Sequence, residues 1–183
     1  MLNTIKTNLN VLEYMNFIWQ SVMDREVVSE TYFHEVANLP DMRVLYDEEF
    51  KAESVRKVLS AICNKELLNT QIVKEKQYWN NNMMATEDRG VLEAMIQPIK
   101  SLNLDGIKDN LNAMADIPYN EIEVVFIPAI KEESFQNGNR LFINFFKIMV
   151  DVFGGTGEVT IMGKSPAEYV QEKVLAMEGV VLK

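Results

Sequence analysis

The sequence predicts an all-α fold of five to seven helices in an irregular bundle, with a minor two-stranded β element near the C-terminus as its only sheet. Three observations favour this fold class. Apolar residues recur at three- and four-residue steps along most of the chain, as the buried face of a helix requires. Residues that interrupt helices are few, with five prolines and eight glycines in 183 residues. Helix-capping residues stand at several ends of the periodic segments.

The size and composition of the chain are those of one globular protein. A chain of 183 residues can bury roughly two thirds of its unfolded surface. Apolar residues make up 48% and charged residues 25% of the sequence, which argues against a largely disordered chain. We expect a single helical domain over 1–183, in which 1–115 form the main helical bundle and 116–183 supply C-terminal helices packed on it.

The charge of the chain limits its partners. The formal net charge is −9, and the lysines and arginines form no run, so we expect neither nucleic acid nor a membrane surface as a partner. The most apolar stretch, 141–153, contains charged residues and is too short to span a bilayer. The single cysteine, Cys63, cannot form an internal disulfide, and the N-terminal residues lack the apolar run of a secretory signal. These features predict a cytoplasmic protein.

The first half of the chain contains the clearest helical patterns. Apolar residues from Leu9 to Val36 follow helical spacing, with a division near Asp24, and the pattern ends before Pro40. Acidic residues at 47–49 open a second helix, because negative charge is favourable in a first helical turn. The polar triplet at 80–82 predicts a turn before the next helix.

The second half is less uniform. Residues 120–130 fit both a strand and a helix, and we favour the helix, which Asn120 can cap. Over 140–153 the polar residues recur at steps of four, three and four, which predicts a mostly buried helix with one narrow hydrophilic stripe; these residues are Arg140, Asn144, Lys147 and Asp151. We expect this helix to end at Gly154.

The last helix has the best local start signal in the chain. Ser165-Pro166-Ala167-Glu168 combines an N-cap serine, a proline in the first helical position and the glutamate of a capping box. Gly163-Lys164-Ser165 also matches the end of a phosphate-binding P-loop, but five residues separate it from Gly157 where a P-loop has four. We therefore predict a capped helix and no nucleotide site. Short extended pieces at 159–162 and 180–182 can form the minor β pair.

Glu26, Glu30 and His34 are the best-defined candidate metal ligands. They follow one another at four-residue steps, so a continuous helix would present all three on one face. Two carboxylates and an imidazole can bind a divalent metal. A carboxylate-bridged di-metal site in a helical bundle draws two histidines from facing helices, and this chain has one. The alternative is a solvated helix face.

No catalytic constellation is visible. Cys63 lies in an apolar helical pattern without an activating motif, and no Gly-x-Ser-x-Gly turn is present. Most of the eleven methionines stand at core positions of the helical pattern, and we expect them to fill gaps between helices. The adjacent aromatics Tyr78 and Trp79 favour a second apolar contact surface, because neighbouring positions on a helix cannot face one core.

These observations favour a cytoplasmic protein-interaction or regulatory helical module that self-associates as a homodimer or binds a protein partner. The alternative is a small-molecule-binding protein or metal-dependent enzyme, with a site between helices that includes Glu26, Glu30 and His34. No cofactor other than a divalent metal is expected.

Overall fold

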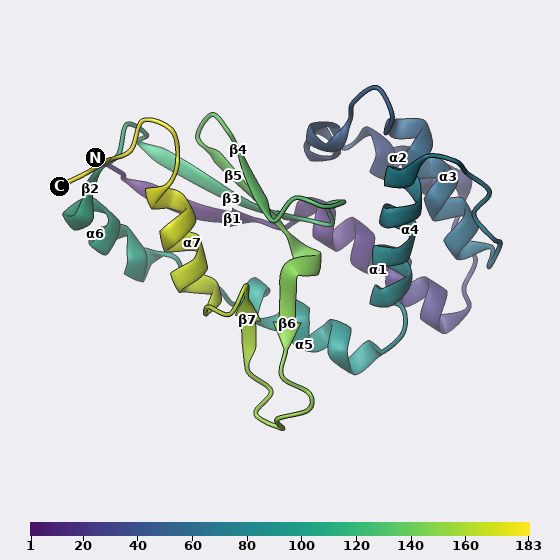
Figure 1. The fold of residues 1–183 in the computed structure, drawn as a ribbon. Helices are drawn as coiled ribbons and strands as arrows, with labels where there is room; N and C mark the ends of the chain where they lie inside the picture. Colours follow the sequence, from purple (N-terminus) through teal and green to yellow (C-terminus); the bar gives the residue numbers. More distant parts are fainter. The chain divides into compact units, whose positions relative to one another are not determined.

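The computed structural model of the chain describes residues 1–183 and has a mixed α/β fold. Helices contain 49% of the residues and strands contain 17%, and four of the strands form a mixed sheet. The prediction of an all-α helical bundle is therefore wrong. The chain divides into two compact units, which we call the sheet unit (1–9, 93–126 and 132–183) and the helical unit (10–92 and 127–131). Figure 1 shows the helices and strands with their labels.

The helical unit contains amphipathic helices in the regions that the sequence predicts. The acidic residues 47–49 do not open a helix, however, because they lie in a non-helical segment and the helix that follows them begins at Ala52. Its elements are α1 (Asn10–Asp24), α2 (Glu30–Asn38), a 3-10 helix at Pro40–Leu45, α3 (Ala52–Cys63), α4 (Val73–Ala85) and the first turn of α5 (Arg89–Lys100). Met15 and Trp19 of α1 and Val55 and Leu59 of α3 are all fully buried, as their helical spacing predicts. Burial of such side chains contributes roughly 1.5–3 kcal/mol each.

The predicted turn at 80–82 is wrong, because α4 continues through all three asparagines. Asn82 is completely buried, and its side chain has partners on both sides. Its Oδ1 accepts a hydrogen bond from the Trp19 indole at 2.9 Å, and its Nδ2 donates to the Tyr78 carbonyl at 2.8 Å. Asn81 donates to the carbonyl of Ile130 at 2.9 Å. These contacts offset the weak helix propensity of asparagine.

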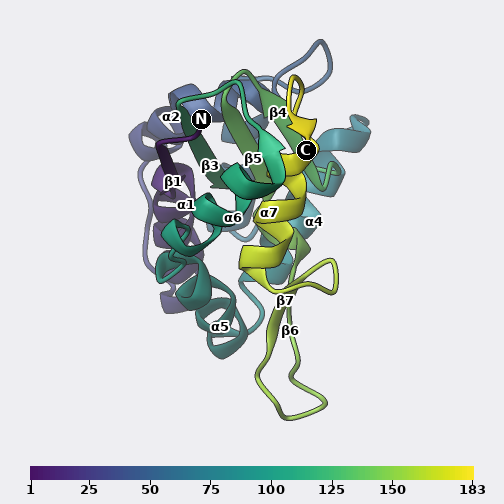
Figure 2. The ribbon, with the colours of Figure 1, turned by 90° about the vertical axis from the view of Figure 1, so that its left-hand side faces the viewer.

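The sheet unit is built on four strands in the order β1, β3, β5, β4. They are β1 (Thr4–Asn8), β3 (Glu121–Ile127), β5 (Arg140–Asn144) and β4 (Ser134–Asn137). The strands β1 and β3 are parallel, whereas β4 and β5 are antiparallel and are joined by a tight turn in which Gly138 has a φ of +60°. Figure 2 shows the helices α6 (Asp105–Met114) and α7 (Pro166–Leu175) beside this sheet.

The helix predicted over 120–130 is wrong, because this segment contains β3, an inner strand of the sheet. Ile122 and the four consecutive residues Val124 to Ile127 are fully buried. A strand that is covered on both faces has a continuous apolar run and loses the alternation that marks a half-exposed strand. Helical spacing then fits the same residues by coincidence.

The helix predicted over 140–153 is also wrong. This segment forms three short elements, which are β5, a 3-10 turn at Phe145–Lys147 and β6 (Ile148–Val150). The members of the predicted polar stripe lie on different elements, and two of them have unrelated partners. Arg140 forms an ion pair with Glu123 at 2.5 Å, and the Asn144 side chain accepts a hydrogen bond from the Phe146 amide at 3.0 Å. The four-residue spacing therefore does not describe one surface.

The C-terminal predictions are partly confirmed. The Ser165 hydroxyl accepts a hydrogen bond from the Glu168 amide and the Glu168 carboxylate accepts one from the Ser165 amide, so α7 begins with the predicted capping box. The predicted extended pieces are strands, but they do not pair with each other. The strand β7 (Val159–Ile161) pairs antiparallel with β6, and β8 (Val181–Leu182) pairs antiparallel with β2 (Ala115–Asp116). No helix is long and apolar enough to cross a membrane.

Candidate functional site

The three predicted metal ligands do not lie on one continuous helix. The helix α1 ends at Asp24 and α2 begins at Glu30, so Glu26 lies in the loop between them. Glu30 accepts a hydrogen bond from the Ser60 hydroxyl at 3.1 Å, and His34 is exposed one turn further along α2. No group of three or more His, Cys, Asp or Glu side chains is placed to hold a metal ion. Metal binding here stays a prediction, which the metal content of purified protein and of His34→Ala would test.

Cys63 is a poor nucleophile in this fold. It lies half-buried at the end of α3. Burial, and then the charge of Glu30, raises the pKa of the Cys63 thiol to about 11. The thiol is therefore protonated at neutral pH, and the thiolate is the reactive form.

The hairpin of β6 and β7, which we call the arm (residues 148–163), carries a group of exposed apolar side chains. Its two strands pair in antiparallel register, with Ile148 opposite Ile161 and Val150 opposite Val159. Figures 1 and 2 show the arm extending away from the four-stranded sheet and from α7. Ile148 and Ile161 are buried and anchor the base of the arm in the sheet unit.

The loop at the end of the arm is held in one conformation by Asp151. Its carboxylate accepts hydrogen bonds from the Thr156 hydroxyl at 2.6 Å and from the Gly154 amide at 2.7 Å. These two bonds lower the pKa of Asp151. A Cβ at Gly154 would collide with that carboxylate and displace it from these hydrogen bonds. Gly157 donates to the Asp151 carbonyl at 3.2 Å and closes the loop.

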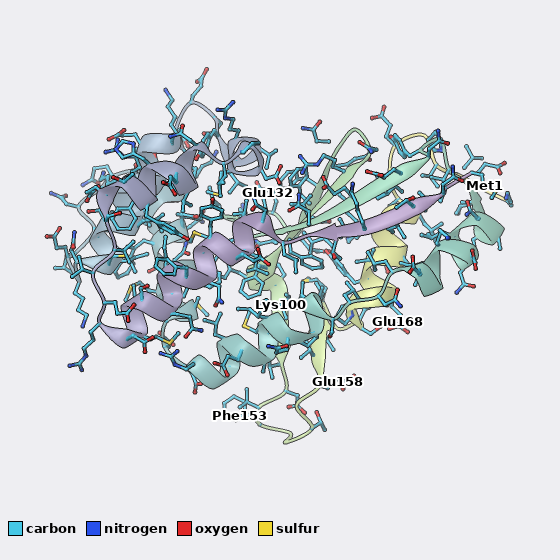
Figure 3. All side chains as sticks on the ribbon, turned by 180° about the vertical axis from the view of Figure 1, so that it is seen from behind. Met1, Lys100, Glu132, Phe153, Glu158 and Glu168 are labelled. Atoms are coloured by element: carbon cyan, nitrogen blue, oxygen red, sulfur yellow. The ribbon has the colours of Figure 1, made fainter.

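The apolar side chains of the arm are open to solvent. Phe153 is fully exposed at the end of the arm, and three more apolar side chains are more than half exposed; these are Met149, Val152 and Met162. The arm contains no lysine or arginine, and its only charged residues are Asp151 and Glu158. Figure 3 labels Phe153 and Glu158, which lie on opposite sides of the loop. Exposed apolar groups gathered in this way mark interaction sites in soluble proteins.

A second apolar surface lies on two loops of the helical unit, which we call the paired loops (24–29 and 64–69). Each loop follows a helix whose end has the same hydrogen bonds. The backbone amide of Glu26 donates to the Ser21 carbonyl, and the backbone amide of Glu66 donates to the Ala61 carbonyl, both at 2.8 Å. The residue before each glutamate is left-handed, with a φ of +58° at Arg25 and of +55° at Lys65. This pattern is a Schellman helix end without glycine.

The paired loops expose equivalent side chains. Val27 is 97% exposed and Leu67 is 91% exposed, and each follows a basic residue and a glutamate. Both loops lie at the same end of the α2 and α3 pair, because the hydrogen bond between Glu30 and Ser60 joins the start of α2 to the last part of α3. Neither Arg25 nor Lys65 has an ion-pair partner in the chain, although each lies beside the glutamate that follows it.

Sequence reasoning missed both surfaces, although each has a signal. The arm has short β-branched runs on both sides of a glycine-rich turn, Gly154-Gly155-Thr156-Gly157, which is the pattern of a hairpin. The paired loops appear as a recurrence, Arg25-Glu26-Val27-Val28 and Lys65-Glu66-Leu67-Leu68. The recurrence is too short for a repeat of fixed period, but it follows a helix on both occasions.

Comparisons of the chain with protein-family models, with curated proteins and with solved structures gave no match. Its function has to be inferred from its own surfaces. Of these, the arm and the paired loops combine strong apolar exposure with a defined backbone conformation.

Proposed function

We propose that the chain is a cytoplasmic protein-interaction or regulatory module that associates with a second copy of itself through the arm. The observation that carries the proposal is the full exposure of Phe153 at the end of a braced loop. A phenylalanine side chain buries about 150–250 Å² when it enters an apolar site, so docking it is a large favourable contribution. Aromatic anchors of this kind dominate the binding energy of many interfaces.

The arm is suited to binding because its conformation is set before contact. The hydrogen bonds from Gly154 and Thr156 to Asp151 order the loop in the free chain. A loop that is already ordered loses less conformational entropy on association, which increases affinity. A flexible glycine-rich loop without this carboxylate would lack that advantage.

The charge of the arm favours a protein partner over a phosphate-rich one. Binding to nucleic acid or to an anionic bilayer depends on lysine and arginine, and the arm has neither. Its Glu158 would be repelled by such surfaces. A protein surface with exposed aliphatic groups and basic side chains is the complementary partner, and the paired loops supply one on the same chain.

The proposal is tested by measuring the mass of the purified chain in solution against concentration, by light scattering or sedimentation. We expect a concentration-dependent oligomer, and we expect Phe153→Ser to weaken association by more than about tenfold. Met84→Ser is the matched control, because Met84 is also an exposed apolar side chain, 67% exposed on α4, but lies outside the arm. A wild-type chain that stays monomeric at all concentrations, or a Phe153→Ser chain that associates normally, would contradict the proposal.

A further inference from the structure

We infer that the arm of one copy docks on the paired loops of another copy. This inference rests on the proposed function and names the surface that receives the arm. It joins two surfaces on which exposed apolar side chains stand on an ordered backbone.

The apolar groups on the two surfaces match in kind. The arm presents Phe153 and Val152 at its end, and the paired loops present Val27 and Leu67 at the same end of two neighbouring helices. Both sides therefore offer exposed apolar groups that water leaves on contact. Both sides of this contact are ordered, because Schellman hydrogen bonds fix the loops and Asp151 fixes the arm.

The charges decide between this contact and an arm-to-arm contact. Glu158 has no ion-pair partner within its own chain. The other charged residue of the arm, Asp151, accepts the hydrogen bonds that order the loop, whereas the Glu158 carboxylate accepts none of them. Two arms placed together would bring two such carboxylates of the same sign into one interface. On the paired loops Glu158 would instead meet Arg25 and Lys65, which precede the exposed aliphatic residues by two positions.

The paired loops also carry Glu26 and Glu66, and their third acidic residue, Asp24, pairs with Arg89. Their remaining charge is therefore balanced, whereas the whole chain has a net charge of −9. The acidic arm of an approaching copy is therefore repelled less by the paired loops than by the rest of the acidic chain surface. Pairs of opposite charge at the rim of such an interface mainly increase the association rate and make it depend on salt.

Each copy has one arm and one set of paired loops, so one arm-to-loop contact leaves one arm and one loop surface open. A second contact fills them, either within the same two copies or with a further copy, in which case the contacts continue until they close a ring or form a filament. In both arrangements, association needs the arm and the paired loops together.

Complementation between two defective chains tests the inference. One chain carries Phe153→Ser, and the other carries Val27→Ser with Leu67→Ser; all three positions are more than nine-tenths exposed, so both chains should fold, which circular dichroism would check. Each chain alone should be monomeric. Mixed together, they should form a one-to-one dimer that grows no further, because only one functional arm and one functional loop surface remain.

The outcomes separate this inference from the proposed function. A loop-defective chain that associates like the wild type would overturn the inference while the arm remained the binding element. Absence of a dimer in the mixture would also overturn it. Normal association of the Phe153→Ser chain would overturn the proposed function itself.

A charge reversal gives an independent test. Arg25→Glu with Lys65→Glu should weaken association by at least about tenfold, and mixing that chain with a Glu158→Lys chain should restore it. Substitution at the left-handed positions exchanges one non-glycine residue for another, so the backbone cost changes little. Association that is unaffected by these charges and by salt would count against the inference.

Discussion

Trp19 and Asn82 form a buried side-chain hydrogen bond across the helical unit, in which the indole Nε1 donates to the amide Oδ1 at 2.9 Å. Both residues are completely inaccessible to solvent. Asn82 also donates to the carbonyl of Tyr78 in its own helix. The Asn82 amide therefore connects α1 to α4. An apolar side chain of similar size at this position would remove the acceptor of the indole proton.

Asn82→Leu should lower the free energy of unfolding by about 2–3 kcal/mol. The substitution removes the acceptor of a buried donor, and the cost of a buried polar group without its partner exceeds the apolar gain from leucine. Urea denaturation followed by tryptophan fluorescence measures the change. Asn80→Leu, at an exposed position of the same helix, is the control and should change stability by less than about 0.5 kcal/mol. Equal effects of the two substitutions would contradict the role of this hydrogen bond.

The same asparagines show why part of the fold could not be predicted. Three consecutive asparagines have poor helix propensity, so a local pattern predicts a turn. Their actual partners, Trp19 and the carbonyl of Ile130, are remote in sequence, and no local signal names them. By contrast, the helices α1 and α3 and the capping box at Ser165 depend on neighbouring residues, and the sequence predicts them correctly.

The candidate site was difficult to predict for a related reason. The proposed metal ligands require a continuous helix through Glu26, but the left-handed residue Arg25 ends α1 just before it. The polar residues at 140, 144, 147 and 151 have the four-, three- and four-residue spacing of a helix, although they belong to a strand, a 3-10 turn and the loop of the arm. Only the glycines at 154–157 indicate a hairpin, and a glycine that ends a helix gives the same local signal.

Lys57→Met should destabilise the helical unit by about 1–2 kcal/mol. The Glu75 carboxylate is 3% exposed and accepts a hydrogen bond from Lys57 Nζ at 2.9 Å. Removing that ammonium leaves a buried carboxylate with only its hydroxyl partners, Thr70 and Ser54. The cost is smaller than for a fully buried ion pair, because Lys57 is 42% exposed and solvent screens its charge. Lys76→Met, on the exposed side of α4, is the control for urea denaturation.

The same carboxylate gives a pH dependence with a definite sign. Burial raises the pKa of Glu75, but its hydrogen bonds from Thr70, Lys57 and Ser54 outweigh burial, so the pKa lies below its usual value. Its contribution to stability is therefore present above the ordinary glutamate pKa of about 4.3 and is lost as the pH falls through the lowered folded pKa. Glu75→Gln should reduce this acid dependence. Unchanged acid dependence in that variant would contradict the assignment.

Cys63 should react with iodoacetamide roughly a hundredfold more slowly than a free cysteine near neutral pH, because its pKa is about 11 and the thiolate is the reactive form. The rate should rise with pH through that value. Glu30→Gln removes the smaller cause of the shift, so the pKa should fall while burial keeps it above the ordinary range of about 8.5. Alkylation of the folded chain at the rate of free cysteine would contradict both statements.

Asp151→Ala should loosen the loop of the arm without unfolding the sheet unit. The carboxylate accepts the hydrogen bonds that fix Gly154 and Thr156, whereas the exposed loop contributes nothing to the buried core. Amide hydrogen exchange at Gly154 should become faster, and association should weaken, because the entropy of ordering Phe153 would then be lost on binding. The matched variant is Glu158→Ala, which should leave Gly154 exchange unchanged.

The same loosening should occur in the wild-type chain at low pH. The folded pKa of Asp151 lies below its usual value, so the hydrogen bonds are intact above about 3.9 and are lost as the pH falls through the lowered pKa. Exchange at Gly154 that is equally fast in the wild-type and Asp151→Ala chains near neutral pH would show that this carboxylate does not order the arm.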